Sequence, residues 1–203
     1  MNVFKITIFS FALTLACEHG AHKKHEHGHE HGKHEHKHGK GGGQYPISQD
    51  VKIGKSLVAQ RYSDIYFAGQ PSDADLELLK KQGFTAVINL RQAQEQAYLE
   101  KDERKKVAEL GLSYENLPTN PGESITDNFI DSVTSLVKKH RGSGKILIHC
   151  SSGNRVGMWL GGHFHKDHKF SKEESLDLAL KLGLKKEKAI EKVKIYLDKT
   201  KKQ

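Results

Sequence analysis

Cysteine and proline are scarce in this sequence, with two cysteines and four prolines among 203 residues. Two cysteines exclude a fold held by a disulfide framework and a zinc fold built from clustered cysteines. Apolar residues make up only 35% of the chain, which indicates that part of it does not enter a core. The length allows one domain, or one domain with a tail.

Histidine, by contrast, is abundant near the N-terminus. Nine of the 14 histidines lie between His19 and His38, in a segment with almost no large apolar residue. Such a segment cannot bury enough surface to offset chain entropy, so residues 17–43 are expected to be a disordered tract and residues 44–203 a folded domain. Imidazole binds zinc, nickel and copper, so the tract is expected to bind these ions, or else to be a hydrophilic spacer. The expected ligands are His25, His27, His29, His31, His34, His36 and His38.

Residues 1–16 are typical of a secretory signal peptide. Lys5 precedes a mostly apolar run, Ile6–Ala16, that is too short to span a bilayer but suits the apolar part of a signal. The small residue directly before Cys17 resembles a bacterial lipobox. This resemblance implies export, cleavage and lipidation of Cys17, giving a periplasmic or outer-membrane-anchored lipoprotein; plain secretion and a cytoplasmic chain are the alternatives.

The net charge of +8 sits at the two ends of the chain. Residues 1–43 carry +2 and residues 181–203 carry +6, so the middle is neutral. Nucleic-acid sites usually interleave arginine and aromatic residues with lysine, whereas this C-terminal segment has lysines and a single Tyr196. No nucleic-acid partner is expected. The Lys-rich segment is expected to be a solvated helix face, with weak attraction to anionic surfaces as the alternative.

Between these ends, apolar strands alternate with helices. Strands are expected at 64–68, 85–90, 113–117 and 145–149. Helices are expected at about 72–82, at 95–110, from a cap at Ser124, from about Val156, at 172–182 and at 186–199. This alternation predicts an α/β sandwich, with a mostly parallel central sheet of about four to five strands flanked by helices.

The segment KILIHCSSGNRVGMWL is the most informative part of the chain. A buried strand ends at Cys150, a short loop follows, and a helix begins just after Arg155. The loop amides and the helix N-terminus attract an anion and favour the thiolate form of the cysteine. Gly153 permits a tight loop, and Arg155 can hold two oxygens with its planar fork. A nucleophile beside an anion-binding loop is what thiolate attack on a phosphoryl group requires; a small buried cysteine at a strand end is the structural alternative.

The loop resembles the motif His-Cys-x-x-Gly-x-x-Arg of cysteine-dependent tyrosine and dual-specificity phosphatases, with one residue fewer between Gly153 and Arg155. Upstream, Phe67–Arg91 resembles the start of the bacterial phosphatase-like domain of beta-lactamase hydrolase-like proteins. The resemblance implies a dual-specificity-phosphatase-like sandwich that hydrolyses phosphomonoesters of small molecules or proteins, without a catalytic cofactor. Cys150 would be the nucleophile and Arg155 the phosphate clamp. The implied substrate-binding residues are His149, Ser151, Ser152, Gly153 and Asn154.

Three features depart from that motif. The Cys-x4-Arg spacing is also that of rhodanese-type sulfurtransferases, so a persulfide on Cys150 is an alternative, and a non-catalytic metal-binding envelope protein is another. Val156 stands where the phosphatases usually carry a serine or threonine that helps the thiolate leave. The loop 117–124, where they carry a general-acid aspartate, has Glu123 as its only carboxylate.

Other polar residues of the domain are expected to have structural roles. Asp127, three residues after Ser124, is expected to start a helix, and His149 to orient the loop. His163, His165 and His168 are expected to be surface residues, with a metal site as the alternative.

Overall fold

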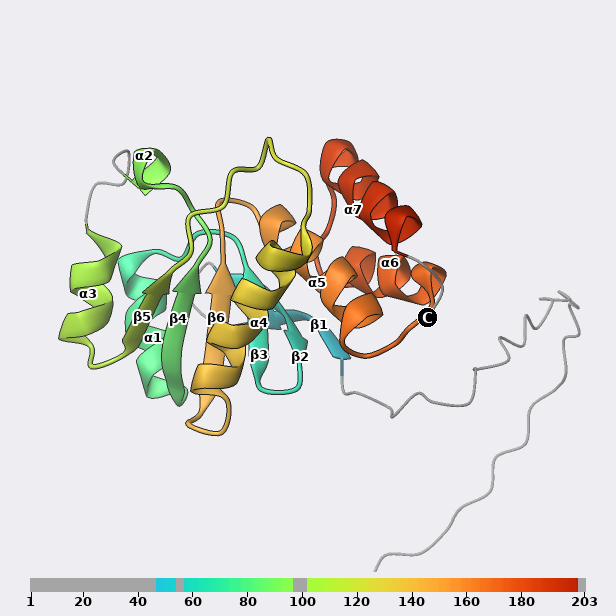
Figure 1. Cartoon of the computed structure of the whole chain (residues 1–203). Coiled ribbons are helices and arrows are strands. Elements are labelled where there is room, and N and C mark those ends of the chain that lie inside the picture. Colours follow the sequence, from blue (N-terminus) through green and yellow to red (C-terminus); the bar gives the residue numbers. More distant parts are fainter. Residues whose placement is uncertain (1–46, 54–56, 97–101, 201–203) are drawn as a thin grey trace, which may run out of the picture. The chain divides into compact units, whose positions relative to one another are not determined.

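The structure is a computed structural model that describes residues 47–53, 57–96 and 102–200, with side chains from residue 50 onward (Figure 1). The signal peptide, Cys17 and the His-rich tract lie outside the described residues. The predictions made for them therefore stay predictions.

One six-stranded sheet forms the centre of the domain, in the order β1-β2-β3-β6-β4-β5. Its strands are β1 Ile47–Lys52, β2 Val58–Tyr62, β3 Ile65–Ala68, β4 Phe84–Asn89, β5 Ser113–Asn116 and β6 Lys145–His149. Strands β3, β6, β4 and β5 are parallel, whereas β1 and β2 are antiparallel to their neighbours. The mostly parallel sheet is confirmed.

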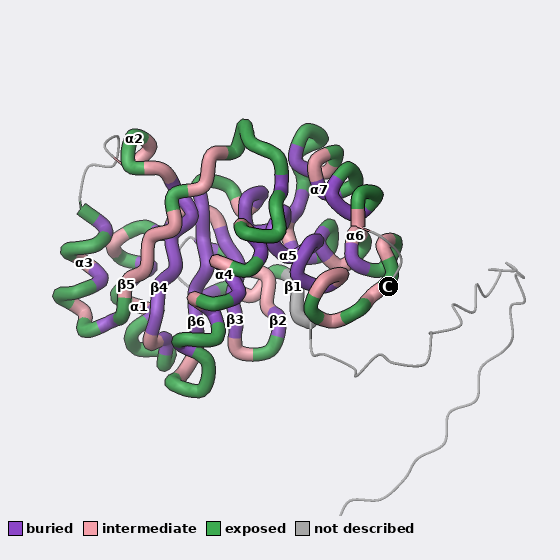
Figure 2. Tube along the Cα trace, viewed as in Figure 1, coloured by how far each residue is buried: buried purple, intermediate pink, exposed green. Residues whose placement is uncertain are grey.

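The helices cover both faces of this sheet. They are α1 Asp73–Lys81, α2 Ala93–Gln96, α3 Glu103–Glu109, α4 Asp127–His140, α5 Asn154–Lys166, α6 Lys172–Lys181 and α7 Glu187–Lys199. Alternate residues of β6 face opposite sides: Ile146 and Ile148 join the core under α4 to α7, and Leu147 joins the core under α1 and α3. The central strands are buried along nearly their whole length (Figure 2). The predicted sandwich, with helices on both faces, is confirmed.

Strands β1 and β2 were not expected from the sequence. The polar Gln60 and Arg61 interrupt the apolar pattern of β2, so the segment does not resemble a buried strand. The turn from β2 to β3 places Ser63 in the left-handed region, at a φ of 57°. The pairing of β2 with β3 is therefore a tertiary feature that extends the expected sheet at one edge.

Three predicted helix boundaries are wrong. The helix expected at 95–110 is two helices, because Asp102 is in extended backbone and its side chain accepts from the Lys105 amide as an N-cap. Thr126, not Ser124, caps α4 by accepting from the Phe129 amide, so Asp127 is the first helical residue. Helix α5 begins at Asn154, two residues before the expected Val156, which brings Arg155 into its first turn.

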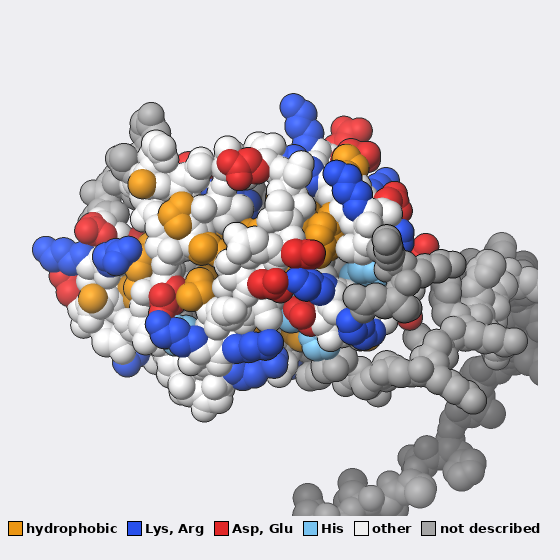
Figure 3. Space-filling view, viewed as in Figure 1, with side chains coloured by type: hydrophobic (Ala, Val, Ile, Leu, Met, Phe, Trp, Pro, Cys, Tyr) orange, Lys and Arg blue, Asp and Glu red, His pale blue; other side chains and the backbone are white. Residues whose placement is uncertain are grey.

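Helix α1 begins as expected. The Ser72 side chain accepts from the Asp75 amide, and the Asp75 carboxylate accepts from the Ser72 amide, which completes a capping box. On the face shown in Figure 3, lysines and arginines are interspersed with acidic side chains rather than gathered in one patch. Among the described residues, none of the helices is long and apolar enough to cross a membrane.

Candidate active site

The loop after β6 lies at the centre of the sheet, where ligands of open parallel sheets usually bind. Strand β6 pairs with β3 on one side and β4 on the other, so Cys150 follows the carboxyl end of a fully flanked strand. Gly69, after β3, forms a bridge with Ser152, and the Gln70 amide donates to the Ser151 carbonyl at 3.3 Å. The loop is thereby held to the segment that follows β3.

The Cys150 sulfur is buried at the base of this loop, with only 1% of the residue exposed. The Gly153 amide donates to the sulfur at 3.1 Å. Gly153 has a φ of 83°, a left-handed conformation that glycine adopts without a Cβ penalty, and it is the N-cap of α5 with no side-chain cap. The first amides of α5 are consequently available to an anion at the sulfur, because no cap residue accepts from them.

The side chains of the other expected substrate-binding residues differ in their surroundings. Ser151 and Ser152 are exposed. The Asn154 side chain is buried and faces the α6–α7 connection, where its oxygen accepts from the amides of Lys185 at 2.9 Å and Lys186 at 2.7 Å. The side chain of Asn154 therefore joins the loop to the C-terminal helices, and only its backbone amide is left for a ligand.

Arg155 is held by a carboxylate that sequence analysis did not identify. Its guanidinium donates to both carboxylate oxygens of Glu95, Nη1 at 2.5 Å and Nη2 at 2.7 Å. Nη1 also donates to the carbonyls of Leu90 and Thr119, each at 3.1 Å. Glu95 lies on the short helix α2 after β4. These contacts take both hydrogens of Nη1 and one of Nη2, so the Nε edge, which has the Nε hydrogen and the second Nη2 hydrogen, remains for an anion.

Glu95 and Arg155 each favour the charged form of the other. The hydrogen bond from Arg155 keeps the pKa of Glu95 below its usual value, so Glu95 stays ionised near neutral pH. Burial would lower the pKa of Arg155, but the Glu95 hydrogen bond and the charges of Cys150 and Glu95 outweigh it and raise that pKa. Cys150 also contributes to this shift, so Arg155 lies close to the sulfur.

A buried polar network lies behind the loop. Glu103 on α3 is 5% exposed, and one of its oxygens lies 3.2 Å from His149 Nε2. Its carboxylate accepts from Gln70 at 2.7 Å, from Asn89 at 2.6 Å and from the Tyr114 hydroxyl at 3.2 Å. Burial raises the pKa of Glu103, but the contact with His149 and the hydrogen bonds from Gln70 and Tyr114 outweigh it, so the pKa is lowered. His149 thus contacts Glu103 behind the loop, and its expected role in orienting the loop stays a prediction.

The loop expected to carry the general acid runs from Leu117 into α4. The Leu117 amide donates to the Asn89 carbonyl, and the Thr119 amide donates to the Leu90 carbonyl, which fixes its first half beside β4. Glu123 is exposed in the second half, where its carboxylate accepts from Asn120 Nδ2 at 3.1 Å. The loop thus contacts Arg155 through the Thr119 carbonyl and carries Glu123 farther along.

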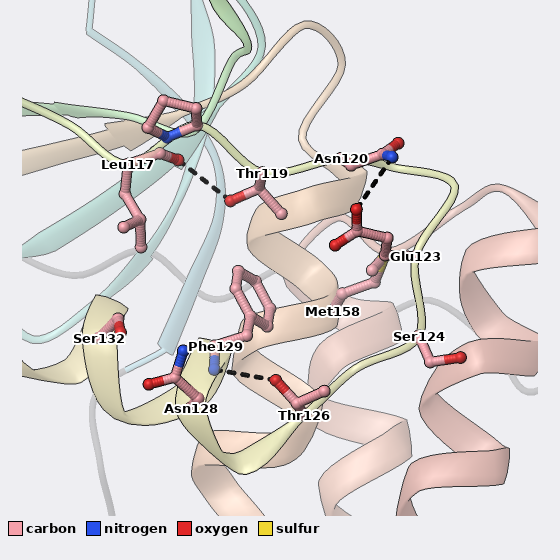
Figure 4. Close-up of a pocket in the computed structure, with 11 residues that line it drawn as sticks. Leu117, Thr119, Asn120, Glu123, Ser124, Thr126, Asn128, Phe129, Ser132 and Met158 are labelled. Carbon is pink, nitrogen blue, oxygen red and sulfur yellow. Dashed lines mark hydrogen bonds between the residues drawn. The ribbon is translucent and has the colours of Figure 1, made fainter.

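A cavity of about 190 Å³ lies under this loop (Figure 4). It is lined by Leu117, Pro118, Thr119, Asn120, Glu123, Ser124, Thr126, Asn128, Phe129, Ser132 and Met158. No residue from His149 to Arg155 lines it, so it is separate from the loop that follows Cys150. Glu123 borders this cavity, and the same loop touches Arg155.

Two other sequence expectations can be compared with the structure. His163 is not a surface residue: it is buried, stacks on Trp159 with ring centroids 4.8 Å apart, and contacts Asp167. The prediction of a surface position was wrong because His163 lies on the inner face of α5, where polar residues are enclosed by α4 and the sheet. Within the part of the chain that the structure describes, no three His, Cys, Asp or Glu residues are grouped to hold a metal ion.

Glu95 and Glu103 are the functional candidates that sequence analysis missed. Both fall in the segment expected to be one Glu- and Lys-rich helix, where carboxylates usually face solvent. No local signal distinguishes them, because their partners Arg155 and His149 lie far along the chain. The motif residues Cys150, Gly153 and Arg155, by contrast, are brought together as expected.

No protein-family model matches the chain, and no curated protein matches it. Solved structures do match. TpbA of P. aeruginosa is 20% identical, with 76% of this chain and 91% of that chain covered at a TM-score of 0.61. A structure of TpbA in complex with pTyr is 17% identical, with 75% and 97% covered at a TM-score of 0.56. KAP, the kinase associated phosphatase, is 15% identical, with 77% and 97% covered at a TM-score of 0.54.

At these identities the likeness shows the fold. The chain has the dual-specificity-type fold of the cysteine-dependent phosphatases, as its sequence motif led us to expect. The narrower resemblance of Phe67–Arg91 to the beta-lactamase hydrolase-like group stays a prediction.

Proposed function

We propose that this protein is a cysteine-dependent phosphatase that hydrolyses phosphomonoesters through a phosphocysteine on Cys150. One observation carries the proposal: the buried Cys150 sulfur accepts from the Gly153 amide at the uncapped start of α5, with the charge of Arg155 close to it. The complex of TpbA with pTyr supports a phosphorylated substrate, in a protein of the same fold.

In the proposed reaction, the amides of residues 151–155 and the Nε edge of Arg155 bind the phosphoryl oxygens. The Cys150 thiolate attacks phosphorus, and the bond from phosphorus to the leaving oxygen breaks. Glu123 donates a proton to that oxygen, so the alcohol or phenol leaves neutral. Water then attacks the phosphocysteine, releases phosphate and restores the thiolate, with Glu123 taking up the water's proton.

Sulfur transfer is the second candidate, because the Cys-x4-Arg spacing brings Arg155 into the first turn of α5. In that reaction the Cys150 thiolate would take the outer sulfur of thiosulfate, releasing sulfite and forming a persulfide, and cyanide would then accept that sulfur as thiocyanate and restore the thiolate. This chemistry does not use a general acid on the loop, so Glu123 distinguishes the two candidates.

The test is an assay of the purified protein with p-nitrophenyl phosphate and, separately, with thiosulfate plus cyanide. We expect phosphate release that Cys150→Ser abolishes. Thiocyanate formation without phosphate release would replace the proposal by sulfur transfer. Turnover of neither substrate would leave a protein that binds anions without catalysis.

We also propose that the protein is exported and anchored through a lipid on Cys17. The lipobox-like sequence before Cys17 supports this. The expected result is incorporation of labelled palmitate into the expressed full chain, and its loss in Cys17→Ser. Incorporation into neither protein, with the chain recovered in the medium, would instead indicate plain secretion.

The His-rich tract is proposed to bind divalent metal ions outside the catalytic site. Its alternating histidines allow several imidazoles to close on one ion. Calorimetric titration with zinc should detect binding by the wild type and a loss of that binding when the seven expected ligands are changed to glutamine. Phosphatase activity should be equal in the two proteins, because the tract is not part of the proposed mechanism.

A further inference from the structure

The C-terminal helix α7 contacts the loop that precedes α4, although the two are about 70 residues apart in sequence. The Lys192 ammonium donates to the Pro121 carbonyl at 2.6 Å and to the Glu123 carbonyl at 2.7 Å. One turn farther along α7, the Tyr196 hydroxyl donates to Asp127 at 2.6 Å. Two successive turns of α7 therefore hold one short segment, residues 121–127.

Helix α7 is itself fixed on α5. Val193 and Leu197 are buried in the core that also contains α5. A Cβ atom added to Gly161 would lie 2.6 Å from Val193 Cγ1, so the helices pack as closely as a glycine allows. Because α5 begins at the Cys150 loop, α7 is connected through packed residues to the site and through Lys192 to the loop.

The loop held by Lys192 contacts Arg155 and carries the proposed general acid Glu123. No helix or strand forms between β5 and α4, so the loop is held by the apolar contacts of Leu117 and Ile125 at its ends and by specific hydrogen bonds between them. Its first half donates to the carbonyls of Asn89 and Leu90 and gives the Thr119 carbonyl to Arg155. Its second half carries Glu123, whose carbonyl is bonded to Lys192. Two carbonyls bonded to one ammonium are charge-assisted contacts, the stronger kind of hydrogen bond.

We propose that Lys192 is a positioning residue of the active site, and that α7 braces the loop that carries Glu123 and gives its Thr119 carbonyl to Arg155. The inference rests on the proposed function, in which Glu123 is the general acid. The Lys-rich end of the chain was expected to be a solvated helix face. At least this lysine has a specific partner and is not simply a solvated charge.

The experiment compares Lys192→Met with Lys194→Met, a matched change at an exposed position two residues along α7. A good leaving group needs little proton donation, whereas a poor one depends on it. We expect Lys192→Met to lower kcat/KM about tenfold for phenyl phosphate and at most about threefold for p-nitrophenyl phosphate. Lys192→Arg, which keeps donors and charge, should retain wild-type values for both substrates, as should Lys194→Met.

A second readout does not depend on activity. Hydrogen exchange of the amides in residues 117–126 should be faster in Lys192→Met than in the wild type and unchanged in Lys194→Met. Equal exchange and equal leaving-group dependence in the two methionine variants would overturn the inference. If the wild type hydrolyses neither phosphate ester, the proposed function fails, and the exchange comparison still decides whether Lys192 braces the loop.

Discussion

The Glu95 carboxylate and the Arg155 guanidinium form a two-point ion pair, with contacts of 2.5 and 2.7 Å. The arginine expected to bind phosphate is thus already oriented by a protein carboxylate. Because Glu95 uses the Nη1–Nη2 edge, the pair leaves the Nε edge open. Glu95 is therefore placed to orient Arg155 for an oxyanion without occupying the same edge.

Replacing Glu95 with glutamine should weaken this orientation. A glutamine amide presents a donor to the guanidinium in place of one acceptor, while the carbonyls of Leu90 and Thr119 still hold Nη1. A hydrogen bond to a charged group contributes about 1.5–3 kcal/mol, and Glu95 is partly exposed, so we expect kcat/KM for an aryl phosphate to fall about tenfold. Inhibition by inorganic phosphate should weaken by a similar factor.

The matched control for that change is Glu109→Gln, at an exposed position of α3, which should leave kcat/KM unchanged. Tighter inhibition of Glu95→Gln by phosphate would contradict the prediction, since it would mean that Glu95 competes with the substrate for Arg155.

Glu103 should be essential to the stability of the domain. Its carboxylate accepts from Gln70, Asn89 and Tyr114, so the amide of Glu103→Gln would direct its own donor at one of these donors. A buried polar group that loses its partner destabilises the folded state, so we expect the free energy of unfolding to fall by about 3 kcal/mol. Urea unfolding followed by the fluorescence of Trp159, the only tryptophan of the chain, measures this.

The control for Glu103 is Glu77→Gln, which removes an exposed ion pair with Lys106 on the same face of the sheet. Surface pairs contribute little, so the urea midpoint should hardly move. Equal losses in both variants would show that burial of the Glu103 network has no special importance.

Helices and strands could be predicted where the residues of the segment itself indicate them. The apolar runs of β4 and β6 and the Ser72–Asp75 capping box identify their elements from a few residues. The candidate nucleophile Cys150 could be found for the same reason, because a strand end, a glycine and an arginine follow one another in the sequence.

The side chains whose roles could not be predicted contact residues that are far away in the sequence. Glu95, Glu103 and Lys192 each lie in a segment rich in lysine and glutamate, where charged side chains usually face solvent. Each becomes specific only when the fold brings Arg155, His149 or the loop carbonyls to it. His163 is the same case, since its burial comes from packing of α5 against α4 and the sheet.

His163 should make stability depend on pH. Burial lowers the pKa of His163 to about 4; the hydrogen bond and charge of Asp167 oppose this, and the charges of His168 and Arg141 add to it. An unfolded histidine has a pKa of about 6.5. Between these values the unfolded chain takes up a proton that the folded chain does not, so stability falls as pH drops from about 6.5 to 4, by up to about 3 kcal/mol.

Urea unfolding between pH 7.5 and 4.5 tests this dependence. In His163→Phe the ring that stacks on Trp159 is kept, but the contacts with Thr134 and Asp167 are lost. The variant should be less stable than the wild type at pH 7.5 and should lose less stability on acidification. An unchanged slope against pH would assign the loss to other groups.

Val156 should limit the second half of the proposed reaction. It is fully buried in the core cluster that also contains Cys150, at the position where the motif of the phosphatases usually has a hydroxyl. Without that hydroxyl, departure of the thiolate from the phosphocysteine lacks a donor, so hydrolysis of the intermediate should be slower than its formation.

Mixing enzyme with excess p-nitrophenyl phosphate should then give a burst of p-nitrophenol equal to the enzyme concentration. Val156→Thr has nearly the same shape and adds a donor, so it should shrink the burst and raise kcat about tenfold, equivalent to about 1.4 kcal/mol. Val156→Ala, which adds no hydroxyl, is the control and should keep the burst; a burst of equal size in the threonine variant would show that a hydroxyl at this position does not speed hydrolysis of the intermediate.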